Sequence, residues 1–145
     1  MTAQPLADLY RETILDHGRN PRRMGPLEGA THEGRDANRL CGDAVTIRVI
    51  IANGHIADAR FEGEGCAISQ ASASMLTDAL PGLSPVAASA LAEEVRDCLS
   101  GTPHPESHHG LASLLAGVRA FPERVTCAML GANALARALA SETGR

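Results

Sequence analysis

The dipeptide Asn53-Gly54, with alternating apolar and polar residues on both sides, constrains the fold of this chain more than any other feature. Asn-Gly favours a two-residue hairpin turn because both residues tolerate a positive φ. We therefore predict two half-buried antiparallel strands at about 45–51 and 57–62, with Ala57, Ala59 and Phe61 on one face of the second. Residues near 31–37 are expected to add a third strand.

The hydrophobic period changes from two to about 3.6 after Gly63-Glu64-Gly65, which predicts helices on the C-terminal side of the hairpin. The predicted helices cover about 5–17, 66–80, 85–99, 111–118 and 127–140, and Ser84-Pro85 is typical of an N-cap followed by a first-turn proline. The 145 residues fit one domain. The predicted fold class is α+β, a small antiparallel three-stranded sheet packed by helices in a single domain, 1–145.

Composition excludes several functional classes. Aromatic residues make up 2% of the chain, so the core must use small aliphatic side chains and closely approaching helices. All 13 basic residues are arginines, which excludes Schiff-base catalysis on a lysine and a Walker-type phosphate loop. The net charge of −4 argues against a nucleic-acid partner, and no segment predicts a signal peptide or a membrane span. We expect a cytoplasmic protein with reduced, reactive or metal-bound cysteines.

Three of the four cysteines fall at predicted junctions between elements. Cys41 precedes the first strand of the hairpin, Cys66 opens a helix, and Cys127 is expected at the start of the last helix. A helix N-terminus favours the thiolate, and Asp43 adds a carboxylate beside the sulfurs. Three thiolates and a carboxylate can complete a tetrahedral zinc site. The spacing alone leaves the alternative that each cysteine is a small buried hydrophobe.

Four ordered blocks of the sequence resemble the IscU/NifU-type family of iron–sulfur assembly proteins, and most closely its SufU branch. The blocks are the opening segment from Leu9 to Gly25, Cys41-Gly42-Asp43, the stretch from Phe61 to Thr77, and Arg124-Val125-Thr126-Cys127-Ala128. Together they run over most of the chain. The resemblance implies a SufE/IscU-like fold, in agreement with the α+β prediction.

Two features resemble the SufU branch more than the IscU branch. The IscU pattern has a histidine directly before the third cysteine, where this chain has Thr126, and the IscU chaperone-recognition motif is not reproduced at residues 121–125. The long interval between the second and third cysteines resembles a SufU-type insertion, at about 81–108. One departure is Asn38-Arg39-Leu40-Cys41, where the family often has Asn-Pro, and this leaves the shape of the loop open.

The resemblance implies a zinc-dependent sulfurtransferase, and hence an enzyme. It implies that Zn²⁺ is bound by Cys41, Asp43, Cys66 and Cys127, with Cys41 as the catalytic acceptor of persulfide sulfur. The implied partners are a pyridoxal-phosphate-dependent cysteine desulfurase of the SufS type and downstream Suf assembly proteins. The alternatives are a scaffold that carries a transient iron–sulfur cluster and a structural zinc module that binds proteins.

Other residues have simpler interpretations. Arg124 is expected to offset the negative charge of the ligands without binding the metal itself. Cys98 is expected to be a buried, inert thiol, and His17 a hydrogen-bonded packing residue. The histidines of the 104–109 loop are interpreted as solvated. Arg19, Arg22 and Arg23 form a basic cluster that is either a solvated face or a docking site for an acidic partner.

Overall fold

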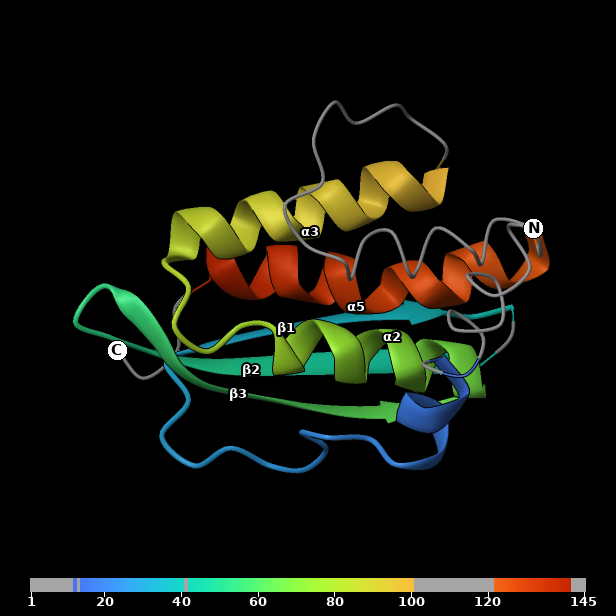
Figure 1. Cartoon of the computed structure of the whole chain (residues 1–145), viewed down its shortest axis with the longest axis horizontal. Helices are drawn as coiled ribbons and strands as arrows, with labels where there is room; N and C mark the ends of the chain where they lie inside the picture. The colour runs from blue at the N-terminus through green and yellow to red at the C-terminus, as the bar shows by residue number, and fades with distance from the viewer. Residues whose placement is uncertain (1–11, 13, 41, 101–121, 142–145) are drawn as a thin grey trace, which may run out of the picture.

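The computed structural model describes residues 12, 14–40, 42–100 and 122–141, and Figure 1 shows their arrangement. Residues 14–19 are helical. The remaining elements, in chain order, are β1 (His32–Asn38), β2 (Asp43–Ala52), β3 (His55–Glu64), α2 (Ala67–Asp78), α3 (Pro85–Ser100) and α5 (Pro122–Ala140). The predicted helix at 111–118, the start of the first predicted helix and the histidine loop lie outside the described residues.

The sheet is antiparallel, with strand order β1-β2-β3, as predicted. Asn53 and Gly54 join β2 to β3 with φ angles of 55° and 79°, so both occupy the left-handed region that a tight hairpin turn requires. The inward face of β2 consists of Val45, Ile47 and Val49, which are fully buried. Strand β1 confirms the additional strand predicted near 31–37.

The prediction that Ala57 faces the core together with Ala59 was wrong. The register between β2 and β3 shifts at Ile50/Ile51, where a β-bulge inserts one residue into β3. The bulge turns Ile56 into the core and leaves Ala57 exposed. Beyond the bulge, Ala59 and Phe61 point inward as expected.

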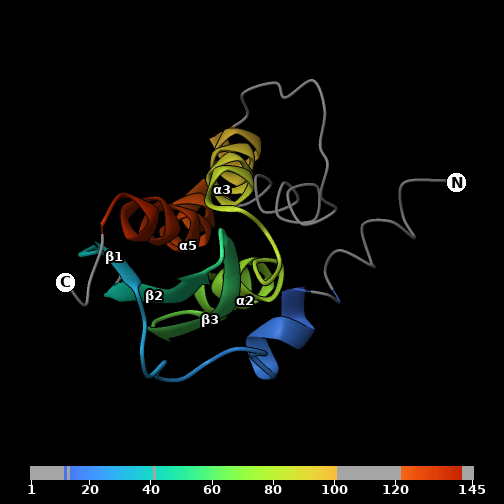
Figure 2. The same cartoon turned by 90° about the vertical axis from the view of Figure 1, so that its left-hand side faces the viewer.

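Helices α2 and α5 cover one face of the sheet, and α3 packs on α5 as an outer layer (Figures 1 and 2). Small residues allow this close packing. A Cβ built on Gly34 of β1 would lie 2.1 Å from the carbonyl oxygen of Ala134 in α5, and one built on Gly131 of α5 would lie 3.3 Å from the Cα of Ala73 in α2. The expectation of closely approaching helices is therefore confirmed.

Both edges of the sheet are covered within the described chain. On the β3 edge, Phe61 N donates to Arg23 O at 2.9 Å, and Gly25 N donates to Phe61 O at 2.8 Å. On the β1 edge, the side chains of Arg137 and Ser141 donate to the carbonyl oxygens of Arg35 and Glu33, at 2.7 and 2.8 Å. These bonds occupy some of the backbone groups that an open edge would present to another strand.

The basic cluster is paired mostly within the chain. Arg22 pairs with Asp16, and its hydrogen bond to that side chain lowers the pKa of Asp16. The guanidinium of Arg23 contacts the carboxylates of Asp58 and Asp78 at 2.8 and 3.3 Å. The Arg23 pairs hold the segment before β1 against β3 and α2, whereas the Arg22 pair is local to the first helix and the turn after it. Both charges are used within the chain, so neither interpretation of the cluster describes them fully.

Two predicted helix boundaries were wrong. The first helix continues through Gly18 to residue 19, two residues past the predicted end. A Cβ on Gly18 would lie 3.2 Å from the carbonyl oxygen of Ala67, so this glycine lets the helix lie close to the start of α2. The last helix begins at Pro122, five residues before the predicted start, because proline is well suited to the first position of a helix. Ser84 caps α3 as predicted, accepting a hydrogen bond from Ala87 N at 3.1 Å.

Candidate metal centre

Asp43 is the first residue of β2, and its carboxylate is buried where the sheet meets the helices, with 3% of the residue exposed. Its Oδ1 accepts a hydrogen bond from the backbone N–H of Cys66 at 3.2 Å. This bond joins the start of β2 to the start of α2. A buried carboxylate that accepts a backbone N–H is held in one orientation, which suits a ligand.

Gly65 makes room for this carboxylate. Its φ is +133°, and a Cβ at this position would lie 2.1 Å from Asp43 Oδ1 and 2.3 Å from Asp43 Cγ. No other residue type can stand here without displacing the Asp43 side chain. The glycine that follows β3 therefore positions the carboxylate as well as ending the strand.

Cys66 is the N-cap residue of α2. Its backbone is extended, with φ −77° and ψ 167°, and its side chain makes no capping hydrogen bond. The half-buried thiol therefore lies at the positive end of the helix dipole without serving as a cap. This confirms that Cys66 opens a helix.

The sequence predicted Cys127 at the start of the last helix, but it lies inside α5. It comes five residues after Pro122, beyond the first turn, where the effect of the helix dipole has largely decayed. The residue is 2% exposed. Next to it, the carbonyl oxygen of Ala128 accepts a hydrogen bond from Ser72 Oγ of α2 at 2.7 Å, which fixes this turn of α5 against α2.

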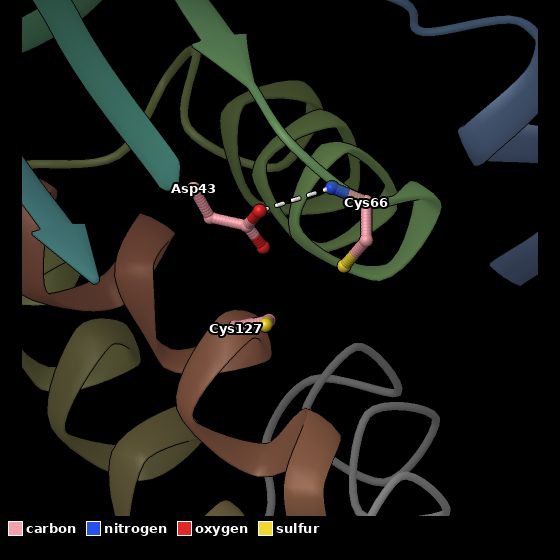
Figure 3. A group of neighbouring side chains, drawn as sticks. All are labelled: Asp43, Cys66 and Cys127. Atoms are coloured by element: carbon pink, nitrogen blue, oxygen red, sulfur yellow. Dashed lines mark hydrogen bonds between the residues drawn. The ribbon is translucent and has the colours of Figure 1, made fainter. Parts of the chain in front are cut away.

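These three side chains converge at one end of the sheet, where β2, α2 and α5 all begin (Figures 1 and 3). The carboxylate oxygen of Asp43 and the sulfurs of Cys66 and Cys127 lie within 4.8 Å of one another. Ligand atoms in a tetrahedral zinc site with sulfur and oxygen donors are about 3.5–3.8 Å apart, from the usual bond lengths. The donor set therefore fits a zinc ion if the three ligand atoms approach one another by about 1 Å, and a fourth ligand position is left open.

The fourth predicted ligand, Cys41, lies outside the described residues, although both of its neighbours are described. Gly42 N donates to Asn38 O at 2.9 Å, and Leu40 N donates to Asn38 Oδ1 at 3.1 Å. Gly42 has a φ of +76°. Asn38 thus organises the turn between β1 and β2 without the proline that the family often has there.

The other predicted residues lie around this centre or away from it. Arg124 is exposed on α5, three residues before Cys127 and so on a neighbouring part of the same helix surface. Cys98 of α3 is half-buried and packs against the core. The prediction that His17 is a hydrogen-bonded packing residue is confirmed, since its Nδ1 lies 2.8 Å from Ser74 Oγ.

Two supporting residues were not identified from the sequence. One is Gly65, interpreted only as the end of a strand. The other is Gln70, whose Nε2 donates to the carbonyl oxygen of Gly63 at 3.2 Å and so ties the end of β3 to α2. The Gly63-Glu64-Gly65-Cys66 run was the available signal, because two glycines beside a candidate ligand indicate a close approach of backbone.

The fold and the site define the class of this protein. It is a small α+β domain that brings two thiols and a carboxylate together at one end of its sheet. The family model described as the NifU-like N terminal domain matches residues 9–128, and the chain belongs to that family. None of the helices in the described residues is long and apolar enough to cross a membrane.

Relatives with two different descriptions resemble the chain about equally. The zinc-dependent sulfurtransferase SufU of Bacillus subtilis is 38% identical over 96% of this chain and 95% of its own length. The iron–sulfur cluster assembly scaffold protein IscU of Streptococcus pyogenes serotype M1 is 39% identical over 96% of this chain and 87% of its own length.

Solved structures agree with the fold. The putative iron–sulfur cluster assembly scaffold protein for the SUF system from Fervidobacterium islandicum superposes with a TM-score of 0.82 at 30% identity, over 88% of this chain and 94% of that one. A NifU-like N-terminal protein from Brucella abortus gives a TM-score of 0.80 at 25% identity, over 93% of this chain and 94% of that one.

Proposed function

We propose that this protein is a cytoplasmic, zinc-dependent sulfurtransferase that accepts persulfide sulfur from a SufS-type cysteine desulfurase and passes it to downstream Suf proteins for iron–sulfur cluster assembly. The observation that carries the proposal is the convergence of Asp43, Cys66 and Cys127 within 4.8 Å. The description of the Bacillus relative, which aligns over nearly the whole of both chains, supports it.

The proposed ligands of Zn²⁺ are Cys41, Asp43, Cys66 and Cys127, and the SufU-type insertion at 81–108 is part of the same proposal. Zinc bound there would keep its cysteine ligands as thiolates at neutral pH and would take no part in electron transfer. The chain itself orients Asp43 through the Cys66 amide and Gly65. Exposed Arg124 would offset part of the negative charge of the ligand set.

The proposed acceptor is the thiolate of Cys41. It attacks the terminal sulfur of the persulfide on the desulfurase, and the sulfur–sulfur bond of that persulfide breaks. The electron pair leaves with the cysteine thiolate of the desulfurase, and Cys41 becomes the new persulfide. Sulfur is transferred without net oxidation, so no further oxidant or reductant is needed.

The alternative is a scaffold on which an iron–sulfur cluster is assembled. The description of the Streptococcus relative favours it, and the same thiols and carboxylate could hold iron. The presence of Thr126 before Cys127, where the IscU pattern has a histidine, favours the sulfurtransferase.

The test is a persulfide-transfer assay with a SufS-type desulfurase and L-cysteine, read by mass spectrometry of the intact chain. We expect one added sulfur on the zinc-loaded wild type and none on Cys41→Ala. Cys98→Ser is the matched control, because this thiol lies on α3 outside the convergence of ligands. Full sulfur acceptance by Cys41→Ala would exclude the proposed acceptor. Iron with visible absorption in the anaerobically purified protein, and a cluster transferable to an apo-protein, would favour the scaffold.

A further inference from the structure

Leu40 projects from the turn between β1 and β2 with 98% of the residue exposed. Two hydrogen bonds to Asn38 lie beside it. The N–H of Leu40 donates to Asn38 Oδ1 at 3.1 Å, and Gly42 N donates to Asn38 O at 2.9 Å. Leu40 is therefore presented to solvent from a backbone that Asn38 holds.

A leucine held in water forgoes the hydrophobic stabilisation that burial would provide. Single exposed apolar residues are common on protein surfaces, so exposure alone assigns no role. The position of Leu40 is what distinguishes it. It directly precedes Cys41, the proposed sulfur acceptor, and lies three residues before the buried carboxylate of Asp43.

The neighbouring residue adds a positive charge. Arg39 is exposed, and no ion pair joins it to any residue that the structure describes. In a chain with a net charge of −4, this turn combines an exposed cation with an exposed apolar side chain. A partner surface complementary to it carries an apolar pocket and a carboxylate.

Resting on the proposed function, we propose that Arg39 and Leu40 form the tip by which this protein docks to the cysteine desulfurase. Consecutive Cα atoms are about 3.8 Å apart, so a desulfurase whose persulfide meets Cys41 comes within reach of Leu40. Leu40 enters an apolar pocket beside the persulfide-bearing cysteine, and Arg39 pairs with a carboxylate at the rim of that pocket. These contacts join Arg39 and Leu40 to the surface of the partner, and the zinc ligands take no part in them.

The first test varies the concentration of Leu40→Ser in the desulfurase assay. Loss of a buried apolar anchor raises the half-saturating concentration by about 10- to 100-fold and leaves the maximal rate unchanged. Val86→Ser is the matched control, since Val86 is 80% exposed on α3, and we expect it to behave as wild type. Equal zinc content in the three proteins excludes an effect through the metal. An unchanged half-saturating concentration for Leu40→Ser, or a lower maximal rate alone, contradicts docking.

The second test measures docking without sulfur transfer. The desulfurase is titrated against Cys41→Ala, with and without Leu40→Ser or Arg39→Ala, at low and high salt. We expect both added changes to weaken binding, and Arg39→Ala to reduce its dependence on salt. Equal affinities overturn the docking proposal whatever the transfer assay shows. Failure of the wild type to accept sulfur while Leu40→Ser still weakens binding would instead overturn the sulfur-transfer step.

Discussion

At the scale of single residues, the candidate metal site depends on a glycine, Gly65. A Cβ on Gly65 would lie 2.1 Å from Asp43 Oδ1, so Gly65→Ala must displace the carboxylate. We expect this variant to lose most of its zinc affinity and about 1–3 kcal/mol of unfolding free energy from backbone strain. Zinc content after chelator competition and denaturant unfolding would measure the two effects.

Gly25→Ala is the control that separates strain from displacement. Gly25 has a φ of +136°, nearly that of Gly65, yet a Cβ there would meet no atom within 4 Å. It should lose a similar amount of stability and retain zinc. If both variants bind zinc as the wild type does, Gly65 does not position Asp43.

His17 provides a pH-dependent contribution at the same scale. Burial, followed by repulsion from Arg22, lowers its pKa from 6.5. The unfolded chain therefore binds a proton more readily than the folded one. The resulting stabilisation is complete above pH 6.5 and is lost as pH falls through the lowered folded pKa.

We expect His17→Asn to flatten the acid side of the stability curve between pH 7 and pH 5. Denaturant unfolding across this range compares the slopes of the variant and the wild type. Ser74→Ala, which removes the hydroxyl beside His17 Nδ1, is a useful companion because it leaves the titrating ring in place. Parallel curves for wild type and His17→Asn would show that His17 does not set the pH dependence.

At the scale of elements, Gly34 determines how closely α5 can lie on β1. A Cβ there would meet three backbone atoms of Ala134 and Ala138 at 2.1–2.9 Å, and backbone cannot move aside cheaply. We expect Gly34→Ala to cost about 3 kcal/mol of unfolding free energy, at the upper end for overpacking. Since α5 carries Cys127, zinc affinity should fall as well. The neighbouring exposed change Arg35→Ala should leave both measurements nearly unchanged.

The elements themselves were largely predictable from the sequence, because alternation and the Asn53-Gly54 turn act locally. Their irregularities were not. The bulge that exposes Ala57 depends on pairing between β2 and β3, which a pattern within one strand does not contain. The start of α5 was missed because Pro122 is compatible with a turn as well as with the first position of a helix.

Part of the candidate site was predictable for a different reason. Asp43, Cys66 and Cys127 were identified from junctions and from family resemblance, and the structure brings these three together. The binding of zinc by them stays a prediction. The supporting contacts could not be inferred, since Gly65 touches Asp43 from a position 22 residues further along the chain. Such contacts arise from the register of the sheet and from helix packing, which are properties of the assembled fold.

At the scale of the whole molecule, the core lies mainly between the sheet and the helices, and its buried side chains are not among the proposed zinc ligands apart from Cys127 and Asp43. Phe61, Ile47, Leu76, Leu130 and Leu135 are each at most 1% exposed. A zinc-finger peptide, by contrast, has too little core to fold without its ion. The centre in this protein joins the ends of elements that already pack on one another.

We therefore expect the zinc-free protein to remain folded, with unchanged far-ultraviolet circular dichroism, and to unfold at a lower temperature than the zinc form. Free zinc at 100 times its dissociation constant would add about 2.7 kcal/mol to the free energy of unfolding. Cys66→Ser should lose most of this gain and yet keep the fold, because its side chain caps nothing in α2. Thermal unfolding of both proteins, with and without chelator, makes the comparison. Collapse of the wild type on chelation would instead favour the structural zinc module, because the ion would then supply the folding energy that we assign to the core.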